Sequence, residues 1–195
     1  MAQDDVRKHS MVIIGGSAGS LEVILKIVAT LPEHSGASYV IVVHRKNDPD
    51  SILKSLLTTK TTMPVKEVED KEDVLPDTIY IAPPDYHLLF ENDLIFSLDS
   101  SEKIHYSRPS IDVTFESAAE IFGSSVVGIL LSGANADGAK GLKKIKQSGG
   151  LVIVQNPETA EVGFMPQQAV DLVKADAIID GGQIGFFLKQ FLEPI

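Results

Sequence analysis

Ser17 is the first residue of the chain whose setting suggests chemistry. It lies in the stretch GGSAGS (15–20), which fits the pattern G-x-S-x-G and stands between the apolar run MVII (11–14) and the helical pattern LEVILKIVA (21–29). A serine on a sharp turn from strand to helix is exposed as a nucleophile, and glycines let neighbouring backbone pass close to it. The same turn could instead bind an anion with its backbone amides at the start of the helix. The stretch alone leaves both interpretations open.

A serine nucleophile needs a base, usually a histidine that a carboxylate orients. His44 is the strongest candidate because it directly follows the run YVIVV (39–43), and sites in open α/β sheets form beyond the carboxyl ends of strands. We therefore predict that His44 and Ser17 meet; the alternative is a strand-end histidine that is only solvated. The other histidines are predicted to be exposed (His9, His34), structural (His87) or in a loop (His105).

The orienting carboxylate should also follow a strand. Asp137 meets this condition, since the run VVGILL (126–131) precedes it and a helical pattern begins there. On periodicity alone, Asp137 could equally be the N-cap of that helix, which is the commonest use of aspartate at a helix start. Asp85 and Asp180, also near strand ends, are the reserve candidates. The chain order Ser, His, Asp differs from the order Ser, Asp, His of the α/β-hydrolases and disfavours that family.

Short β-branched runs that alternate with helical patterns would position these residues. The runs are MVII, YVIVV, TIYIA, VVGILL, LVIV and AIID, at 11–14, 39–43, 78–82, 126–131, 151–154 and 177–180. The alternation predicts an α/β fold of three layers, in which a mostly parallel twisted sheet is flanked by helices. HLLFE and DLIFSL, around Asn92-Asp93, predict an antiparallel hairpin near the edge. Two apolar stripes are predicted to face the core: Leu21, Ile24, Leu25 and Val28, and Ile184, Phe187, Leu188 and Phe191.

Length and composition restrict the classes of function. The 195 residues fit one domain, predicted over 11–195 after a disordered tail at 1–10. The chain has no cysteine, which excludes a thiolate nucleophile, and no cluster of ligand-type residues suggests a metal or another cofactor. Its net charge of −10 argues against nucleic-acid binding. The N-terminus is not a signal peptide and no apolar run approaches the roughly 20 residues of a membrane span, so we expect a cytoplasmic protein without membrane insertion.

Six segments, in this order, resemble the catalytic domain of the chemotaxis protein-glutamate methylesterases, the CheB family. They are GGSAGS, the His of VVHRKNDPD, IAPPDYHLL, YSRPSIDVTFESAA, LLSGANADGAKG and NPETAEVGFMPQQAV, and they cover nearly the whole chain. The resemblance implies an α/β fold with a Ser-His-Asp triad that hydrolyses glutamate γ-methyl esters, and in many members deamidates glutamines, on chemoreceptor helices. The family's nucleophile, base and orienting carboxylate fall on Ser17, His44 and Asp137. Its oxyanion donors fall on the backbone amides of Ala18 and Ala134, and it requires no cofactor.

The sequence departs from the family pattern at several positions. Ser20 replaces the usual last glycine of the first motif, and Ala134 replaces a methionine, which implies a roomier pocket. Gln167 and Gln168 replace the family's basic residue after the Met-Pro pair. The first ten residues cannot hold the receiver domain that many members carry, so we expect a stand-alone member or regulation by a separate chain.

Two alternatives to a receptor methylesterase follow from the same residues. One is a serine hydrolase with a different ester or amide substrate, because pocket shape sets the leaving group. The other is a non-catalytic signalling module that binds an anion or a protein through the Ser17 loop, since a fold does not decide a function.

Overall fold

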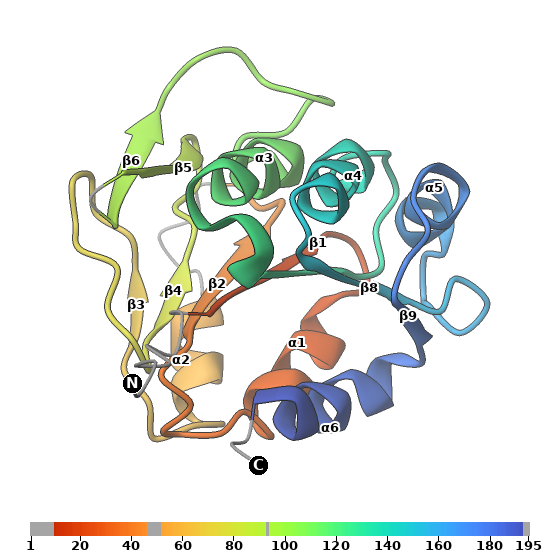
Figure 1. The fold of residues 1–195 in the computed structure, drawn as a ribbon, viewed down its shortest axis with the longest axis horizontal. Helices are drawn as coiled ribbons and strands as arrows, with labels where there is room; N and C mark the ends of the chain where they lie inside the picture. The colour runs from red at the N-terminus through yellow and green to blue at the C-terminus, as the bar shows by residue number, and fades with distance from the viewer. Residues whose placement is uncertain (1–9, 47–51, 93, 193–195) are drawn as a thin grey trace, which may run out of the picture.

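The computed structural model describes residues 10–46, 52–92 and 94–192. Apart from Ser10, the predicted tail at 1–10 lies outside these residues, and so does Asp93 of the predicted hairpin turn. The chain forms the expected three-layer α/β fold, with helices above and below a central sheet (Figure 1).

The central sheet has seven strands in the order β3-β4-β2-β1-β7-β8-β9, and every pairing is parallel. The strands are β1 (Met11–Gly16), β2 (Ser38–Val43), β3 (Val65–Glu67), β4 (Ile79–Ile81), β7 (Val126–Leu130), β8 (Leu151–Gln155) and β9 (Ala177–Ile179). The chain builds one side of β1 first and then crosses to β7 on the other side. The winding therefore reverses beside β1, and the carboxyl ends of strands at such a point are where doubly wound folds place their sites.

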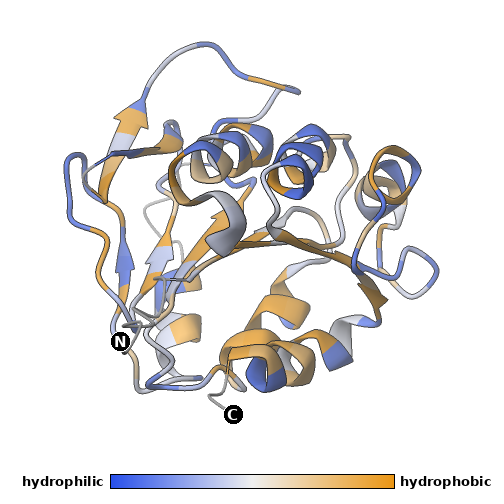
Figure 2. Ribbon diagram, in the orientation of Figure 1, coloured by the Kyte–Doolittle hydropathy of each residue, from blue (hydrophilic) through white to orange (hydrophobic). Residues whose placement is uncertain are grey.

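All six predicted strands are confirmed. Strand β9, at the sheet edge, is only partly buried, but the other five are buried, and strands buried on both faces read as continuous apolar runs. Figure 2 shows this hydrophobic character along the central strands. The seventh strand, β3, was not predicted. Its sequence, Val-Lys-Glu, has no apolar run, and it pairs only with β4 at the sheet edge, where a short polar strand is tolerated.

Helices cover both faces of the sheet (Figure 1). One face carries α1 (Leu21–Val28), α2 (Leu53–Thr58) and α6 (Gly181–Leu192), and the other carries α3 (Ile111–Phe122), α4 (Ala139–Gln147) and α5 (Phe164–Leu172). A 3₁₀ turn at Gly123–Ser125 joins α3 to β7. Each face has its own hydrophobic core, so the sheet is rigid where its strands end at the site.

Each of the two apolar stripes is confirmed except at one end, and Leu25 and Phe187 are partly buried against the same core. Ile24, Val28, Ile184 and Leu188 are buried, whereas Leu21 is 44% exposed and Phe191 is 52% exposed. Both exposed residues stand in a terminal turn of their helix, where fewer neighbours cover the side chain.

The predicted hairpin is also confirmed. Strands β5 (His87–Glu91) and β6 (Ile95–Asp99) pair antiparallel in a separate two-stranded sheet that packs on α3. The Phe90 amide donates to Ser117 Oγ at 2.7 Å, and the Phe90 ring meets the Phe122 ring edge-on. The segment from 100 to 110, which we name the return loop, runs from this hairpin to α3 and carries several residues of the site.

Candidate active site

Ser17 follows the last residue of β1, on a turn that is held from both sides. Its amide donates to the Ser132 carbonyl at 2.9 Å, and its carbonyl accepts from Ser20 Oγ at 2.7 Å. A Cβ on Gly16 would lie 2.6 Å from Ser20 Cβ, and Gly19 has a φ of +77°. Glycine is needed at both positions because one lacks space and the other has left-handed backbone. The predicted sharp turn is present, and Ser17 is half-buried on it.

His44 lies beside Ser17 because β1 and β2 are neighbours in parallel register. Gly16 pairs with Val43, and the His44 amide donates to the Gly16 carbonyl at 3.3 Å. Ser17 directly follows β1 and His44 directly follows β2, so the two residues lie next to each other. Ser17 and His44 therefore stand at the carboxyl ends of adjacent strands, as predicted, and a reaction between their side chains stays a prediction.

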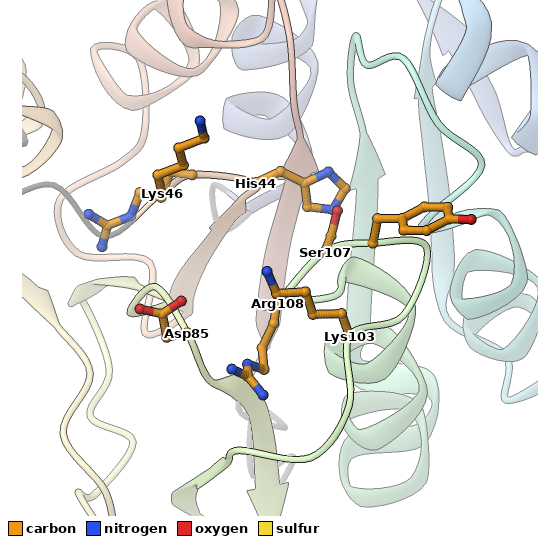
Figure 3. Close-up of a pocket in the computed structure, with 8 residues that line it drawn as sticks. His44, Lys46, Asp85, Lys103, Ser107 and Arg108 are labelled. Atoms are coloured by element: carbon orange, nitrogen blue, oxygen red, sulfur yellow. The ribbon is translucent and has the colours of Figure 1, made fainter.

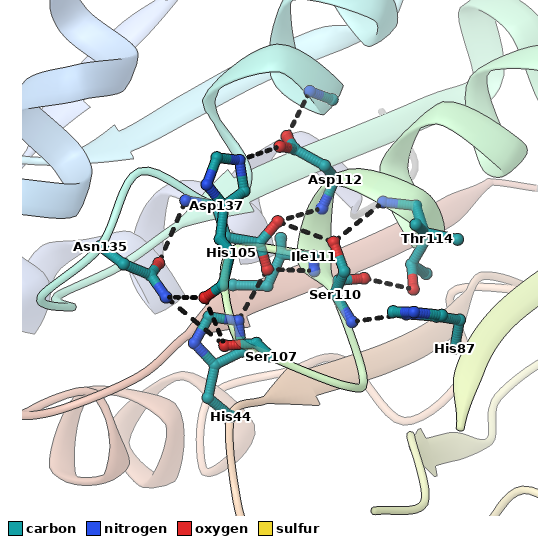
Figure 4. Close-up of polar contacts among 12 residues, drawn as sticks. His44, His87, His105, Ser107, Ser110, Ile111, Asp112, Thr114, Asn135 and Asp137 are labelled. Atoms are coloured by element: carbon teal, nitrogen blue, oxygen red, sulfur yellow. Dashed lines mark hydrogen bonds and ion pairs between the residues drawn. The ribbon is translucent and has the colours of Figure 1, made fainter. Parts of the chain in front are cut away.

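Asp137 completes the cluster from the loop after β7. Its Oδ2 lies 2.7 Å from His44 Nε2, and the carboxylate is fully buried (Figure 4). The N-cap interpretation is wrong for the helix that follows, since Gly138 stands at the N-cap of α4. The Asp137 carboxylate instead accepts from the Ile111 and Asp112 amides of α3, at 2.7 and 2.9 Å. It thus caps a helix more than twenty residues earlier in the chain.

The hydrogen bonds around Asp137 determine its charge. Burial by itself would raise the pKa of this carboxyl, but the hydrogen bond with His44 and the α3 amides lower the pKa below its ordinary value. Ser110 Oγ adds another donor at 2.8 Å. Asp137 is therefore a carboxylate at neutral pH, with its oxygens fixed against the imidazole.

The bond to Asp137 also assigns the two nitrogens of His44. An ionised carboxylate only accepts hydrogen bonds, so Nε2 carries the proton that lies between the two groups. Nδ1 is then the nitrogen left to accept a proton. This is the reverse of the serine-protease arrangement, in which Nδ1 faces the aspartate and Nε2 faces the serine.

Two backbone amides beside the cluster are available as donors. Within the described residues, neither Ala18 nor Ala134 donates its amide to another protein group. Their loops are joined through Ser132, whose Oγ lies 2.7 Å from the Ala18 carbonyl, and Met165 anchors the second loop by donating its amide to the Gly133 carbonyl at 3.0 Å. The amides predicted for an oxyanion thus stand on loops that follow the neighbouring strands β1 and β7.

A second His-Asp pair beside the first was not predicted. His105 Nε2, from the return loop, lies 3.6 Å from Asp112 Oδ2 (Figure 4). Asp112 is buried and accepts from the Gly141 amide at 2.7 Å. Burial raises its pKa to about 6, and the nearby Asp137 charge adds to the rise. In sequence, Asp112 shows only as a polar residue in the first turn of a helix, which is an ordinary place for aspartate.

The remaining sequence candidates lie apart from the triad cluster. His34 is exposed, as predicted, and the His9 prediction falls outside the described residues. His87 is structural, as predicted: it is buried, donates to the Glu102 carbonyl at 2.9 Å and accepts from the Ser110 amide at 3.1 Å. Of the reserve carboxylates, Asp180 is exposed and bonded to Asn156 and Thr159, while Asp85 is exposed on a pocket wall.

That pocket adjoins His44 and has a volume of about 320 Å³. One wall is the segment that follows β2, with Arg45 and Lys46. The other is the return loop, with Lys103 and Arg108 (Figure 3). Among the described residues, no group of three or more His, Cys, Asp or Glu side chains is arranged to hold a metal ion. In the same part of the chain, no helix has the length and apolarity needed to cross a membrane.

The fold and the cluster together define a doubly wound α/β domain with a serine, a histidine and an aspartate near its winding reversal. The CheB methylesterase family model matches residues 12–188. The chain belongs to this family.

Individual relatives agree with this membership. A Leptospira interrogans protein, named provisionally as a protein-glutamate methylesterase/protein-glutamine glutaminase, is 42% identical over 171 residues, 88% of this chain and 89% of that protein. The protein-glutamate methylesterase/protein-glutamine glutaminase of Thermotoga maritima is 37% identical over 180 residues, and the chain spans 52% of its length. The crystal structure of the Thermotoga maritima CheB methylesterase catalytic domain superposes with a TM-score of 0.86 at 36% identity, covering 94% of this chain and 98% of that one.

Proposed function

We propose that this protein hydrolyses γ-methyl esters of glutamyl side chains on chemoreceptor helices in the cytoplasm, and that residues 11–195 form its catalytic domain. The observation that carries the proposal is the 2.7 Å bond between His44 and Asp137, beside the strand end that bears Ser17. The names of the relatives support the substrate class, since they are protein-glutamate methylesterases. Ser17 is the nucleophile, His44 the base and Asp137 the orienting carboxylate.

The first step forms an acyl-enzyme. His44 Nδ1 takes the proton of Ser17 Oγ as that oxygen attacks the ester carbonyl carbon. Asp137 stabilises the resulting imidazolium, because its charge faces Nε2. The tetrahedral intermediate then breaks its bond to the methoxy group, which leaves as methanol with the proton from Nδ1. A glutamyl ester of Ser17 remains.

The oxyanion of that intermediate needs donors already in place. The amides of Ala18 and Ala134 have this role, and removing one such donor from a hydrolase typically costs about 3 kcal/mol in the transition state. The ties through Ser132 and Met165 keep the two loops in position. No rearrangement of their backbone is then needed during the reaction.

The second step hydrolyses the acyl-enzyme and regenerates Ser17. Water attacks the glutamyl ester while His44 Nδ1 takes its proton, and the same proton then goes to the departing Ser17 oxygen. The product is a glutamyl carboxylic acid, which loses its proton to solvent at neutral pH and becomes glutamate. A glutaminyl side chain follows the same path with ammonia as the leaving group, so we propose protein-glutamine deamidation as a second reaction of this site, in agreement with the double name of the relatives.

A fluorophosphonate probe tests the nucleophile. We expect covalent capture of the wild-type protein, with the added mass on the peptide that contains Ser17, and no capture of Ser17→Ala. A folded wild-type protein that does not react would contradict the proposal and favour the non-catalytic binding module. Capture at a different serine would displace Ser17 as the nucleophile.

A further inference from the structure

The pocket beside His44 is cationic on a protein that is strongly anionic. Arg45, Lys46, Lys103 and Arg108 line it against one carboxylate, Asp85, while the whole chain carries a net charge of −10. We propose that this pocket binds a carboxylate side chain of the substrate protein, three or four residues from the methyl ester, and so selects esters with an acidic neighbour. The inference rests on the proposed function and adds a specificity determinant to it.

The cations of the pocket are held in different ways. Arg108 Nη1 donates to the Ser100 and Ser101 carbonyls, each at 2.7 Å, which fixes the guanidinium in the return loop without neutralising it. Arg45 forms an ion pair with Glu67 and also donates to the Ala82 carbonyl. Its charge is therefore largely offset. Arg108 is the anchored cation, and part of its charge acts on the nearby Asp99, whose pKa it helps to lower.

The two lysines supply charge that solvent reaches. Lys46 and Lys103 are exposed and come from opposite walls. Figure 3 shows Lys103 extending from the return loop toward the space between His44 and Arg108, whereas the Lys46 side chain points away from that space. A carboxylate in this space would face Lys103 and Arg108 together.

The distance from the reacting ester follows from the position of His44. His44 belongs both to the pocket and to the proposed triad, so an ester at Ser17 and a group in the pocket are close neighbours. On a helix, side chains three or four residues apart share a face with Cβ atoms about 5–6 Å apart. An acidic side chain at that spacing can enter the pocket while the ester meets Ser17. Gln167 and Gln168 of α5 carry no positive charge at the position where the family has a basic residue. The cations of the pocket would supply a positive charge for the substrate instead.

The test uses helical peptides that carry one glutamate γ-methyl ester. In the acidic peptides a Glu stands four residues before or after the ester, and in the matched peptide Ala replaces it, because a Gln could be converted to Glu by the proposed deamidation. Methanol release gives kcat/KM for each. We expect the wild-type protein to prefer one acidic peptide over the Ala peptide by about tenfold at low salt, and the preference to shrink as added salt screens the charges.

Substitutions of single lysines show whether the preference for the acidic peptide depends on the pocket. Lys103→Gln should reduce it about two- to fivefold, the scale of one exposed ion pair, through KM and not kcat, and Lys103→Glu should abolish or reverse it. Lys143→Gln is the matched control, because it removes one exposed lysine of α4 that does not line the pocket, and the preference should remain. Melting temperatures show that each variant is folded.

The outcomes separate the two proposals. Equal hydrolysis of the acidic and Ala peptides, or an equal loss of preference in Lys103→Gln and Lys143→Gln, overturns the pocket while the methylesterase activity stands. Absence of methanol release from every peptide refutes the proposed function, and the specificity inference falls with it.

Discussion

The carboxylate of Asp137 connects His44 to the first turn of α3. One oxygen, Oδ2, lies 2.7 Å from both His44 Nε2 and the Ile111 amide, while Oδ1 accepts from Ser110 Oγ and the Asp112 amide. The residue proposed to orient the base therefore also closes a helix end. Catalysis and local stability should depend on the same two oxygens.

Asp137→Asn should reduce turnover by about 10⁴-fold. An amide NH₂ in the place of Oδ2 would donate to Nε2, so the imidazole proton would move to Nδ1 and remove the proposed base; a serine protease loses about this factor on the same change. The Ile111 amide would also lose its acceptor, which typically costs about 1–3 kcal/mol when the donor is buried. Turnover and the free energy of unfolding should be measured together.

Asp180→Asn is the control for that change, since Asp180 is an exposed carboxylate at another strand end. It should slow turnover by less than about tenfold. If Asp180→Asn removed the activity and Asp137→Asn kept it, the orienting role of Asp137 would be wrong.

Activity should fall as the pH is lowered from neutral into the acid range, because a protonated His44 cannot accept the proton of Ser17. The measurement is the pH profile of kcat/KM for methanol release, with chemistry shown to be rate-limiting. A flat profile across this range would rule out a histidine base.

Ser17→Ala and His44→Ala should each cause nearly the full loss of turnover, and the double variant should be no slower than either single variant. Residues that act in one mechanism lose activity non-additively, because the second change removes nothing that still works. Rates of the three variants on one methylated substrate decide this. A double variant slowed by the product of the two single fold-losses would mean that Ser17 and His44 act separately.

The buried Asp112 should make the protein less stable as pH rises from about 4 to 6. Its pKa is about 6 in the folded protein against an ordinary value of 3.8, so the folded state binds more protons than the unfolded state in this window. Stability therefore falls as pH rises through the window. In Asp112→Asn the amide oxygen can still accept from the Gly141 amide. The cost of ionising the buried carboxyl, about 2–3 kcal/mol, is then absent.

Urea unfolding of the wild-type protein and Asp112→Asn at several pH values measures this difference. The gap between the two free energies should change in favour of the variant as pH rises from 4 to 6, and then level off. Curves that stay parallel over the whole range would show that Asp112 has no raised pKa.

The sequence predicts that Ser17 and His44 stand side by side, because their positions depend only on strand order and on the rule that sites form at the carboxyl ends of strands. The central strands were equally readable, since burial on both faces leaves an apolar run. Asp137 was harder to interpret: from sequence, an aspartate before a helix looks like the cap of that helix, whereas the carboxylate caps α3 instead.

Features that form through contacts between distant segments cannot be predicted from the sequence. The His105–Asp112 pair forms only because the return loop folds back over the start of α3, and no local pattern encodes that path. The cationic pocket has the same origin, since Lys46 and Lys103 are brought together by the fold from separate loops. Strand β3 was missed for a different reason, namely that an edge strand needs few apolar residues.

Methanol release from a methylated chemoreceptor fragment tests the central claim most directly. The wild-type protein should release methanol and leave a glutamate at the esterified position, as mass spectrometry of the fragment would show. Ser17→Ala fits the same turn without the hydroxyl and should release methanol only at the background rate, with an unchanged melting temperature. Methanol release by Ser17→Ala at the wild-type rate would contradict the assignment of this chain as a serine methylesterase. So would the absence of methanol release by the folded wild-type protein.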